Sequence, residues 1–295
     1  NSQLVKRIIL LLLAYVIIQL LIAVNIINDY LQATLVTICI NIILAVSLNL
    51  ITGFTGQFSL GHAGFMSIGA YTCAIITMKM PTLGGFVLGV VMGAIMAAVV
   101  GFIVGLPTLR LRGDYLAIAT LGMSEIIRIV FTNLDSITNG AAGLNGIPRF
   151  VNWTWLYIFV VGIILLIRNF LKSSHGRACI AIREDEVAAE AMGINTTKYK
   201  VLAFIIGAFC AGIGGALYSS YFYYIKPDLF GFLKSVDILV IVVLGGLGSI
   251  SGSVLAAILL AVVSTYFQSF PEIRMILYAL ILIIIMIFRP QGLLG

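Results

Sequence analysis

The chain has 295 residues, of which 61% are hydrophobic and only 9% are charged, and its mean hydropathy is +1.16. A soluble domain carries about 25% charged residues, so this composition excludes an ordinary soluble protein and predicts an all-α polytopic membrane protein. The formal net charge of +6 is assigned to loop cations that fix orientation in the membrane, not to nucleic-acid binding.

The length accommodates roughly ten spans of about 20 residues, which predicts one transmembrane domain over residues 1–295. The first span is expected over about 8–27, retained and not cleaved as a signal peptide, with Lys6 and Arg7 at its cytoplasmic start. The second span, about 31–51, carries Asn41 and Asn49. Amides are costly in lipid, so both are expected to face other helices.

A glycine-rich stretch follows the second span. Residues 53–69 hold five glycines, Gly53, Gly56, Gly61, Gly64 and Gly69, with Gln57, Ser59 and His62 among them. Non-helical backbone at membrane depth is tolerated only where protein or a water-filled cavity covers it, so this stretch predicts a broken or re-entrant segment before the third span. His62 fits equally a path-lining or proton-relaying role and a packed histidine bonded to its neighbours.

The fourth and fifth spans are expected over about 84–106 and 115–131. Glu125 and Arg128 lie three residues apart in the fifth span and therefore on one helical face. An unpaired charge near the middle of a membrane is expensive, which predicts an ion pair turned toward the protein interior. The polar loop 132–154 is expected outside, and the sixth span over about 155–167 returns inside.

Residues 168–200 form a charged island between apolar stretches, with six of the 17 Lys and Arg and four of the 11 acids. Short loops rich in Lys and Arg stay on the cytoplasmic side. Residues 181–192 are predicted to form one short helix with acids in its early turns and a stop at Gly193. Its small apolar surface indicates that another protein docks there, although a solvated loop helix without a partner is the plainer alternative.

The remaining spans are expected over about 201–218, 236–247, 254–270 and 273–288. Gly212, Gly214 and Gly215 in the seventh span predict a close helix contact. The aromatic loop 219–235 is expected outside, and Gly-Ser residues 245–253 interrupt the eighth and ninth spans. With both termini cytoplasmic, 11 Lys and Arg fall inside, 5 outside and Arg128 within a span, as the positive-inside rule requires.

Glycine-rich interruptions therefore occur once in each half of the chain, and such pairs indicate a transport path. Small polar residues at the two interruptions are the predicted path-lining set: Asn49, Gly53, Gly56, Gln57, Ser59, Gly61, His62, Gly245, Gly246, Gly248 and Ser249. An ion-coupled secondary carrier is the rival reading; it needs an intramembrane acid, and only Glu125 is expected to qualify. A channel fits the glycine-rich breaks but leaves the charged island without a role. No catalytic motif, phosphate-cradling motif or metal-type cysteine pairing is present, so neither an enzyme nor a metal site is expected.

Four segments carry a resemblance to a known family: ITGFTGQFSLGHAGFMSIGAY, LRGDYLAIATLGMSEIIRIVFTN, GRACIAIREDEVAAEAMGIN and VLGGLGSISGSVLAA. They resemble the permeases of bacterial branched-chain amino acid ABC importers, of the LivM type, over about residues 41–292. The resemblance implies a fold similar to vitamin B12-type importer permeases in the bacterial cytoplasmic (inner) membrane. It also implies four kinds of partner: the lipid bilayer, a LivH-type sister permease, two LivG/LivF-type ATPase subunits that bind ATP and Mg, and an extracytoplasmic amino-acid-binding protein. No cofactor is expected in this chain.

The same resemblance implies that the charged island is the cytoplasmic coupling loop that touches the ATPase. The implied coupling residues are Arg183, Glu184, Asp185, Glu186, Ala188, Ala189 and Gly193. Many importer permeases carry Glu-Ala-Ala, three residues, then Gly. Here Val187 occupies the Glu position and Glu186 lies one place early, so the assignment rests on position and character. Relatives that carry urea or short amides leave the cargo open.

Overall fold

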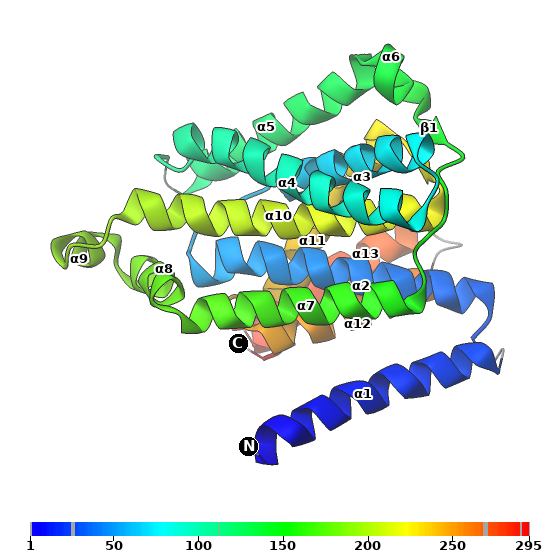
Figure 1. Cartoon of the computed structure of the whole chain (residues 1–295). Coiled ribbons are helices and arrows are strands. Elements are labelled where there is room, and N and C mark those ends of the chain that lie inside the picture. Colours follow the sequence, from blue (N-terminus) through cyan, green and yellow to red (C-terminus); the bar gives the residue numbers. More distant parts are fainter. Residues whose placement is uncertain (1, 25–26, 112, 268–270, 290, 295) are drawn as a thin grey trace.

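The structure is a computed structural model that describes residues 2–24, 27–111, 113–267, 271–289 and 291–294. The described chain is almost entirely helical (Figure 1). Its elements in order are α1 (Ser2–Ala23), α2 (Asp29–Asn49), the π-helical turn η1 (Leu50–Phe54), α3 (His62–Lys79), α4 (Leu83–Thr108), α5 (Asp114–Asn133), α6 (Asp135–Thr138), the 3-10 turn η2 (Gly140–Ala142), β1 (Leu144–Asn145), α7 (Trp153–Lys172), α8 (Ser174–Glu184), α9 (Glu186–Ala191), α10 (Thr196–Phe222), β2 (Tyr224–Ile225), η3 (Pro227–Phe230), α11 (Phe232–Gly245), α12 (Ile250–Tyr266) and α13 (Pro271–Phe288).

A helix occupies each of the ten apolar ranges predicted from the sequence. Among the described residues, five helical segments are long and apolar enough to cross a membrane: Asp29–Phe54, Leu83–Thr108, Asp114–Asn133, Trp153–Lys172 and Thr196–Phe222. The count of ten crossings stays a prediction. The expected end of the ninth span at Phe270 and the expected loop cation Arg112 lie outside the described residues.

Helix α10 is the centre of the bundle and packs along α3, α4 and α2. Small residues allow this close approach. A Cβ at Gly215 would collide with the Met66 carbonyl of α3, and one at Gly212 would meet the Ala97 methyl of α4 at 2.7 Å. The close helix contact predicted from the glycines of α10 is therefore confirmed.

Helix α2 is the second buried element and packs against α7, α11 and α12 as well as α10. Its last residues are fully enclosed, including the polar Ser47 and Asn49. Asn49 therefore faces other parts of the protein, as expected for an amide in an apolar helix.

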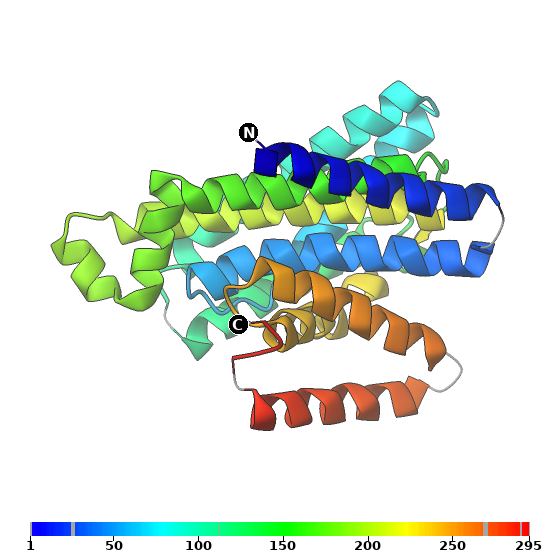
Figure 2. The same cartoon turned by 90° about the horizontal axis from the view of Figure 1, so that it is seen from below.

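The connecting segments gather at the two ends of the bundle (Figures 1 and 2). Helices α8 and α9 project from one end, whereas β1, β2 and α6 lie at the other. The two strands pair antiparallel, with Leu144 opposite Ile225, and so join the loops 132–154 and 219–235. The loops predicted on opposite sides of the membrane thus lie at opposite ends of the molecule.

Candidate functional site

The first interruption lies between α2 and α3. Helix α2 ends in the π-helical turn η1, and residues 55–61 are non-helical before α3 begins at His62. Gly56 has a φ of +73°, a conformation that side chains with a Cβ rarely adopt. The break predicted from the glycines is present, but α3 resumes within the predicted range, so the non-helical part is shorter than expected.

The second interruption lies between α11 and α12 and comprises residues 246–249. Gly246 and Gly248 have φ values of +110° and +89°. The Ser249 side chain then caps α12 by accepting a hydrogen bond from the Gly252 N–H at 3.1 Å, which satisfies one of the free donors at the helix start. The chain is thus broken and restarted within a few residues.

Asn49 joins the two interruptions. Its Oδ1 accepts a hydrogen bond from the Gly248 N–H at 2.9 Å. Its Nδ2 donates to the Ser249 carbonyl at 2.9 Å and to Ser253 Oγ at 2.8 Å. Asn49 is completely buried, and the backbone groups freed by the second break are therefore satisfied by one side chain from the helix before the first break.

Arg183 brings the coupling loop to the same place. This residue lies near the end of α8, and its Nη1 donates a hydrogen bond of 2.6 Å to the Gly53 carbonyl of η1. A Cβ at Gly248 would lie 2.6 Å from the same Nη1, and one at Gly56 would lie 3.2 Å from Arg183 Cγ. Arg183 therefore lies against both interruptions. We call Asn49, Gly53, Arg183 and Gly248 the junction.

The coupling loop contains two helices where the sequence predicts one over 181–192. Helix α8 ends at Glu184, and Asp185 is extended, with a φ of −158° and a ψ of 109°. Its carboxylate accepts hydrogen bonds from the N–H groups of Val187 and Ala188 at 2.9 and 3.0 Å and so caps α9. The prediction of one helix is wrong because an aspartate that can bond the following backbone favours a helix start over a helix interior.

Two hydrogen bonds fix α9 against α10. Lys200 Nζ donates to Glu186 Oε1 at 2.7 Å, and Thr196 Oγ1 donates to Glu190 Oε1 at 2.7 Å. Lys200 is buried. Glu186, proposed from the sequence as a docking residue, is turned inward to hold the loop.

The outer face of α9 carries exposed apolar side chains. Val187 and Met192 are 70% and 83% exposed, and Ala188 is also exposed. Ala189 is buried at 5%, so it packs against the loop itself, whereas Gly193 has open space around it and a φ of +83°. Val187, Ala188 and Met192 therefore form an exposed apolar patch, beside the exposed residues Glu190 and Ala191.

The other predicted path residues are mostly buried inside this chain. His62 is 1% exposed, and its Nε2 lies 2.7 Å from Ser47 Oγ. Ser59 is 1% exposed, whereas Gly56 is exposed. Their role in a path stays a prediction.

A cavity of about 250 Å³ separates the first interruption from the start of α9. Gln57, Arg183 and Lys200 are among its lining residues. The Gln57 side chain is 3% exposed, and neither of its amide atoms has a hydrogen-bond partner within the described residues. The coupling loop therefore does not close fully onto the first interruption.

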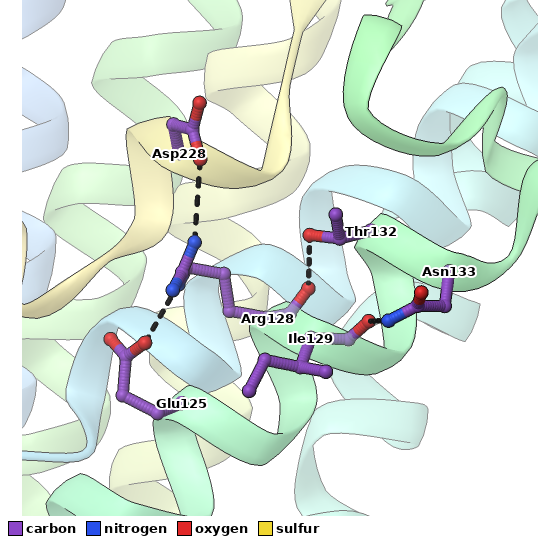
Figure 3. A network of polar contacts seen from close by, with 6 residues as sticks. All are labelled: Glu125, Arg128, Ile129, Thr132, Asn133 and Asp228. Carbon is purple, nitrogen blue, oxygen red and sulfur yellow. Dashed lines mark hydrogen bonds and ion pairs between the residues drawn. The ribbon is translucent and has the colours of Figure 1, made fainter.

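The predicted ion pair lies on α5 (Figure 3). Arg128 Nε lies 2.7 Å from Glu125 Oε2, and Arg128 Nη1 lies 3.3 Å from Asp228 Oδ1 of η3. The Glu125 and Arg128 side chains are about 30% exposed, so they are not enclosed by this chain. Asp228 was not expected as a partner, because it lies 100 residues away in a loop.

The four cysteines are buried and form no disulfide bond. Burial raises the pKa of Cys179 in α8 to about 11, so its thiol is protonated at neutral pH. Within the ranges that the structure describes, no three His, Cys, Asp or Glu side chains come together in a way that could hold a metal ion.

Comparison with known proteins gives one family and several relatives. The family described as "Branched-chain amino acid transport system / permease component" matches residues 30–286. The LivM permease proteins of the high-affinity branched-chain amino acid transport systems of Escherichia coli and Salmonella typhimurium are 36% and 35% identical to this chain. Each of those alignments spans 289 residues and covers 86% of this chain and 68% of the relative.

The Escherichia coli LivH permease protein of the corresponding system is 25% identical and aligns over 86% of this chain and 90% of its own length. Among solved structures, PsaBC from Streptococcus pneumoniae in complex with Fab matches with a TM-score of 0.50. It is 14% identical, and the match covers 93% of this chain and 97% of that chain. At that identity the structural match supports the fold alone.

Proposed function

Because this chain belongs to the family of branched-chain amino acid transport permease components, we propose that it is the transmembrane permease subunit of an ABC importer. It passes hydrophobic branched-chain amino acids that an extracytoplasmic binding protein delivers. Separate cytosolic ATPase subunits bind ATP and Mg and drive the cycle, and a sister permease completes the path. In this arrangement the chain lies in the bacterial cytoplasmic membrane with both termini inside and catalyses no reaction itself.

The observation that carries this proposal is that one loop contains an exposed apolar face and is also bonded to the junction. A polar loop at one end of an otherwise apolar bundle presents an exposed apolar face formed by Val187, Ala188 and Met192. The same loop is bonded through Arg183 to the first interruption. A subunit that is moved by a partner needs both features, a docking face and a rigid connection to the part that opens.

The proposed movement follows from these contacts. When the ATPases close, they displace α9 and, through it, α8. Arg183 transmits the displacement to the Gly53 carbonyl, and Asn49 transmits it onward to Gly248 and Ser249. The cavity between the first interruption and α9 provides space for this shift. The ends of α2, α11 and α12 then move together, since one buried amide links all three.

A secondary carrier needs an intramembrane acid, and the sequence-based expectation that only Glu125 qualifies is wrong. Asp237 lies inside α11 and lines a cavity. A carrier would, however, give no role to the exposed apolar face of α9. We therefore keep the importer as the proposal, with urea or short amides as the alternative cargo.

Two measurements test the proposal. An affinity-tagged chain expressed with its neighbouring subunits should bring down ATPase subunits, and uptake of labelled leucine by the complete system should be inhibited by isoleucine and valine but not by urea. Leucine uptake that continues without ATPase subunits would refute the importer. If urea inhibits uptake and isoleucine and valine do not, urea or a short amide replaces the branched-chain amino acids as the proposed cargo.

A further inference from the structure

A second cavity, of about 590 Å³, lies between α2, α10, α11 and α12. Its residues come from α2 between Tyr30 and Asn41, from the end of α10, from η3, from α11 between Lys234 and Ile241, and from the end of α12. Most of the lining residues on α2, and the charged ones on α11, lie toward the helix end that is remote from the junction. By the predicted topology this is the extracytoplasmic end, where a binding protein would release its cargo.

The cavity carries charges of both signs. Lys234 and Asp237 line it and lie three residues apart on α11, hence on one helical face. Asn41 of α2 also lines it, and its Oδ1 accepts a hydrogen bond from Lys234 Nζ at 3.3 Å. An ammonium, a carboxylate and an amide thus meet in one partly enclosed space within the apolar bundle.

The rest of the wall combines apolar and aromatic side chains with the hydroxyl groups of Thr34, Thr37, Ser264 and Thr265. It includes Tyr218, Phe222, Leu229, Ile241, Leu260 and Ala261. The volume lies within the range of roughly 300–1,000 Å³ that is usual for small-molecule sites, which combine apolar walls with a few polar groups. None of the path residues predicted from the glycine-rich interruptions lines this cavity.

We infer that this cavity is an amino-acid site in the permease, in which Asp237 receives the α-ammonium group of the cargo, Lys234 receives its α-carboxylate and the apolar wall receives its aliphatic side chain. The inference rests on the proposed function and adds a substrate site to it. A zwitterion requires both charges in one place, and Lys234 and Asp237 supply opposite charges three residues apart on α11. Urea, which is neutral and lacks an aliphatic part, would use neither feature.

The position of the cavity also connects it to the junction. Asn41 lies eight residues before Asn49 on α2, about 12 Å along the helix. Ile241, which lines the cavity, lies four residues before the end of α11 at Gly245. A shift of these helix ends would therefore alter the inner end of the site.

The test uses the full chain with its sister permease in lipid nanodiscs, and labelled leucine as the probe. Asp237→Asn and Lys234→Gln should each weaken leucine binding by about tenfold or more, because each removes one charge-assisted contact. Asp237→Asn should leave the weaker binding of 4-methylpentanoate, which lacks the ammonium group, unchanged. Lys234→Gln should do the same for isoamylamine, which lacks the carboxylate.

Asp29→Asn and Lys226→Gln are the matched controls. Each makes the same charge change at the same end of the bundle, and neither residue lines the cavity. Both should bind leucine like wild type. Wild-type leucine binding in Asp237→Asn and Lys234→Gln would overturn the site, as would equal losses in the controls.

A cysteine at Ser264, on the cavity wall, provides a measurement that does not depend on the charge variants folding. The four native cysteines are buried, so background labelling is low. Leucine at millimolar concentration should slow maleimide labelling of Ser264→Cys severalfold, and urea should not. Absence of leucine protection would overturn the site, and protection by phospholipid alone would identify the cavity as a lipid pocket.

Leucine uptake by the complete wild-type importer separates the two proposals. If the wild-type importer and the Asp237→Asn variant take up leucine at the same rate, the proposed amino-acid site is refuted but the proposed importer function is not. If the wild-type importer moves no branched-chain amino acid, both the proposed function and the proposed site are refuted.

Discussion

Replacing Arg183 with alanine should uncouple ATP hydrolysis from transport while leaving the permease folded. The substitution removes the hydrogen bond of 2.6 Å to the Gly53 carbonyl, which joins α8 to η1. Hydrogen bonds to charged groups contribute about 1.5–3 kcal/mol. The Arg183 side chain is 38% exposed, so the lower end, about 1.5 kcal/mol, applies here. That is roughly a tenfold change in an equilibrium.

The assay is the number of substrate molecules moved per ATP hydrolysed, measured in proteoliposomes that contain the complete importer. Arg183→Ala should lower this ratio about tenfold, with ATPase activity and permease abundance close to wild type. Arg183→Lys should recover only part of the loss, because a lysine ammonium lacks the planar, extended set of donors.

Arg177→Ala is the matched control, since Arg177 lies on the same helix and is exposed. The substitution removes the same charge from α8 without touching the junction. A wild-type ratio in Arg183→Ala, or an equal loss in Arg177→Ala, would refute the reasoning that the connection runs through this one side chain.

Three further predictions concern other contacts. Asn49→Leu should lower the melting temperature in detergent, because it leaves buried backbone groups of the second interruption unpaired, at about 1–3 kcal/mol each. Glu125→Ala should reduce abundance only slightly, since Arg128 keeps Asp228 as a partner and ion pairs in contact with solvent contribute about 0.2–1 kcal/mol. The double variant Glu125→Ala with Asp228→Asn should reduce abundance by more than the sum of the reductions in the two single variants. Cys179, whose pKa burial raises to about 11, should resist maleimide at pH 7.5 until the protein is unfolded.

Each of these has its own control. Asn133→Ala removes an exposed amide that bonds within its own helix and should not change the melting temperature. Additive losses in the double variant would show that Asp228 does not share the role of Glu125. Val187→Cys, at a position that is 70% exposed, should label rapidly under the conditions in which Cys179 does not.

The sequence was sufficient to locate the helices and both interruptions, because these are local properties. Long apolar stretches, glycines and short polar segments occur together at each boundary, and the observed helices begin and end near the predicted positions. The close packing of α10 was also predictable, since several glycines within one apolar helix have few other uses.

The contacts between distant segments could not be predicted. Asn49 and Gly248 lie 199 residues apart, and no local pattern states that the two interruptions meet. Arg183 resembled the other loop cations in the sequence, although its side chain donates a hydrogen bond to η1. Asp237 lay within a predicted span and was missed because its neighbours are apolar.

The coupling loop shows a different kind of error, in the reading of a local pattern. A helical pattern over 181–192 was predicted without weighing Asp185 as a cap, so the division of this stretch into α8 and α9 was missed. Ala189 is enclosed, whereas Val187 and Met192 are outermost. Capping residues inside a charged stretch therefore carry more information about the docking face than the stretch as a whole.

The central claim is that the permease is moved from the cytoplasm through α9. The most direct test is a single cysteine at Met192, which is 83% exposed, in the complete importer in intact cells and in inverted vesicles. The account predicts that this cysteine crosslinks to an ATPase subunit and reacts with a membrane-impermeant reagent only in inverted vesicles. Labelling from outside intact cells, or crosslinking to the binding protein instead of the ATPase, would contradict it.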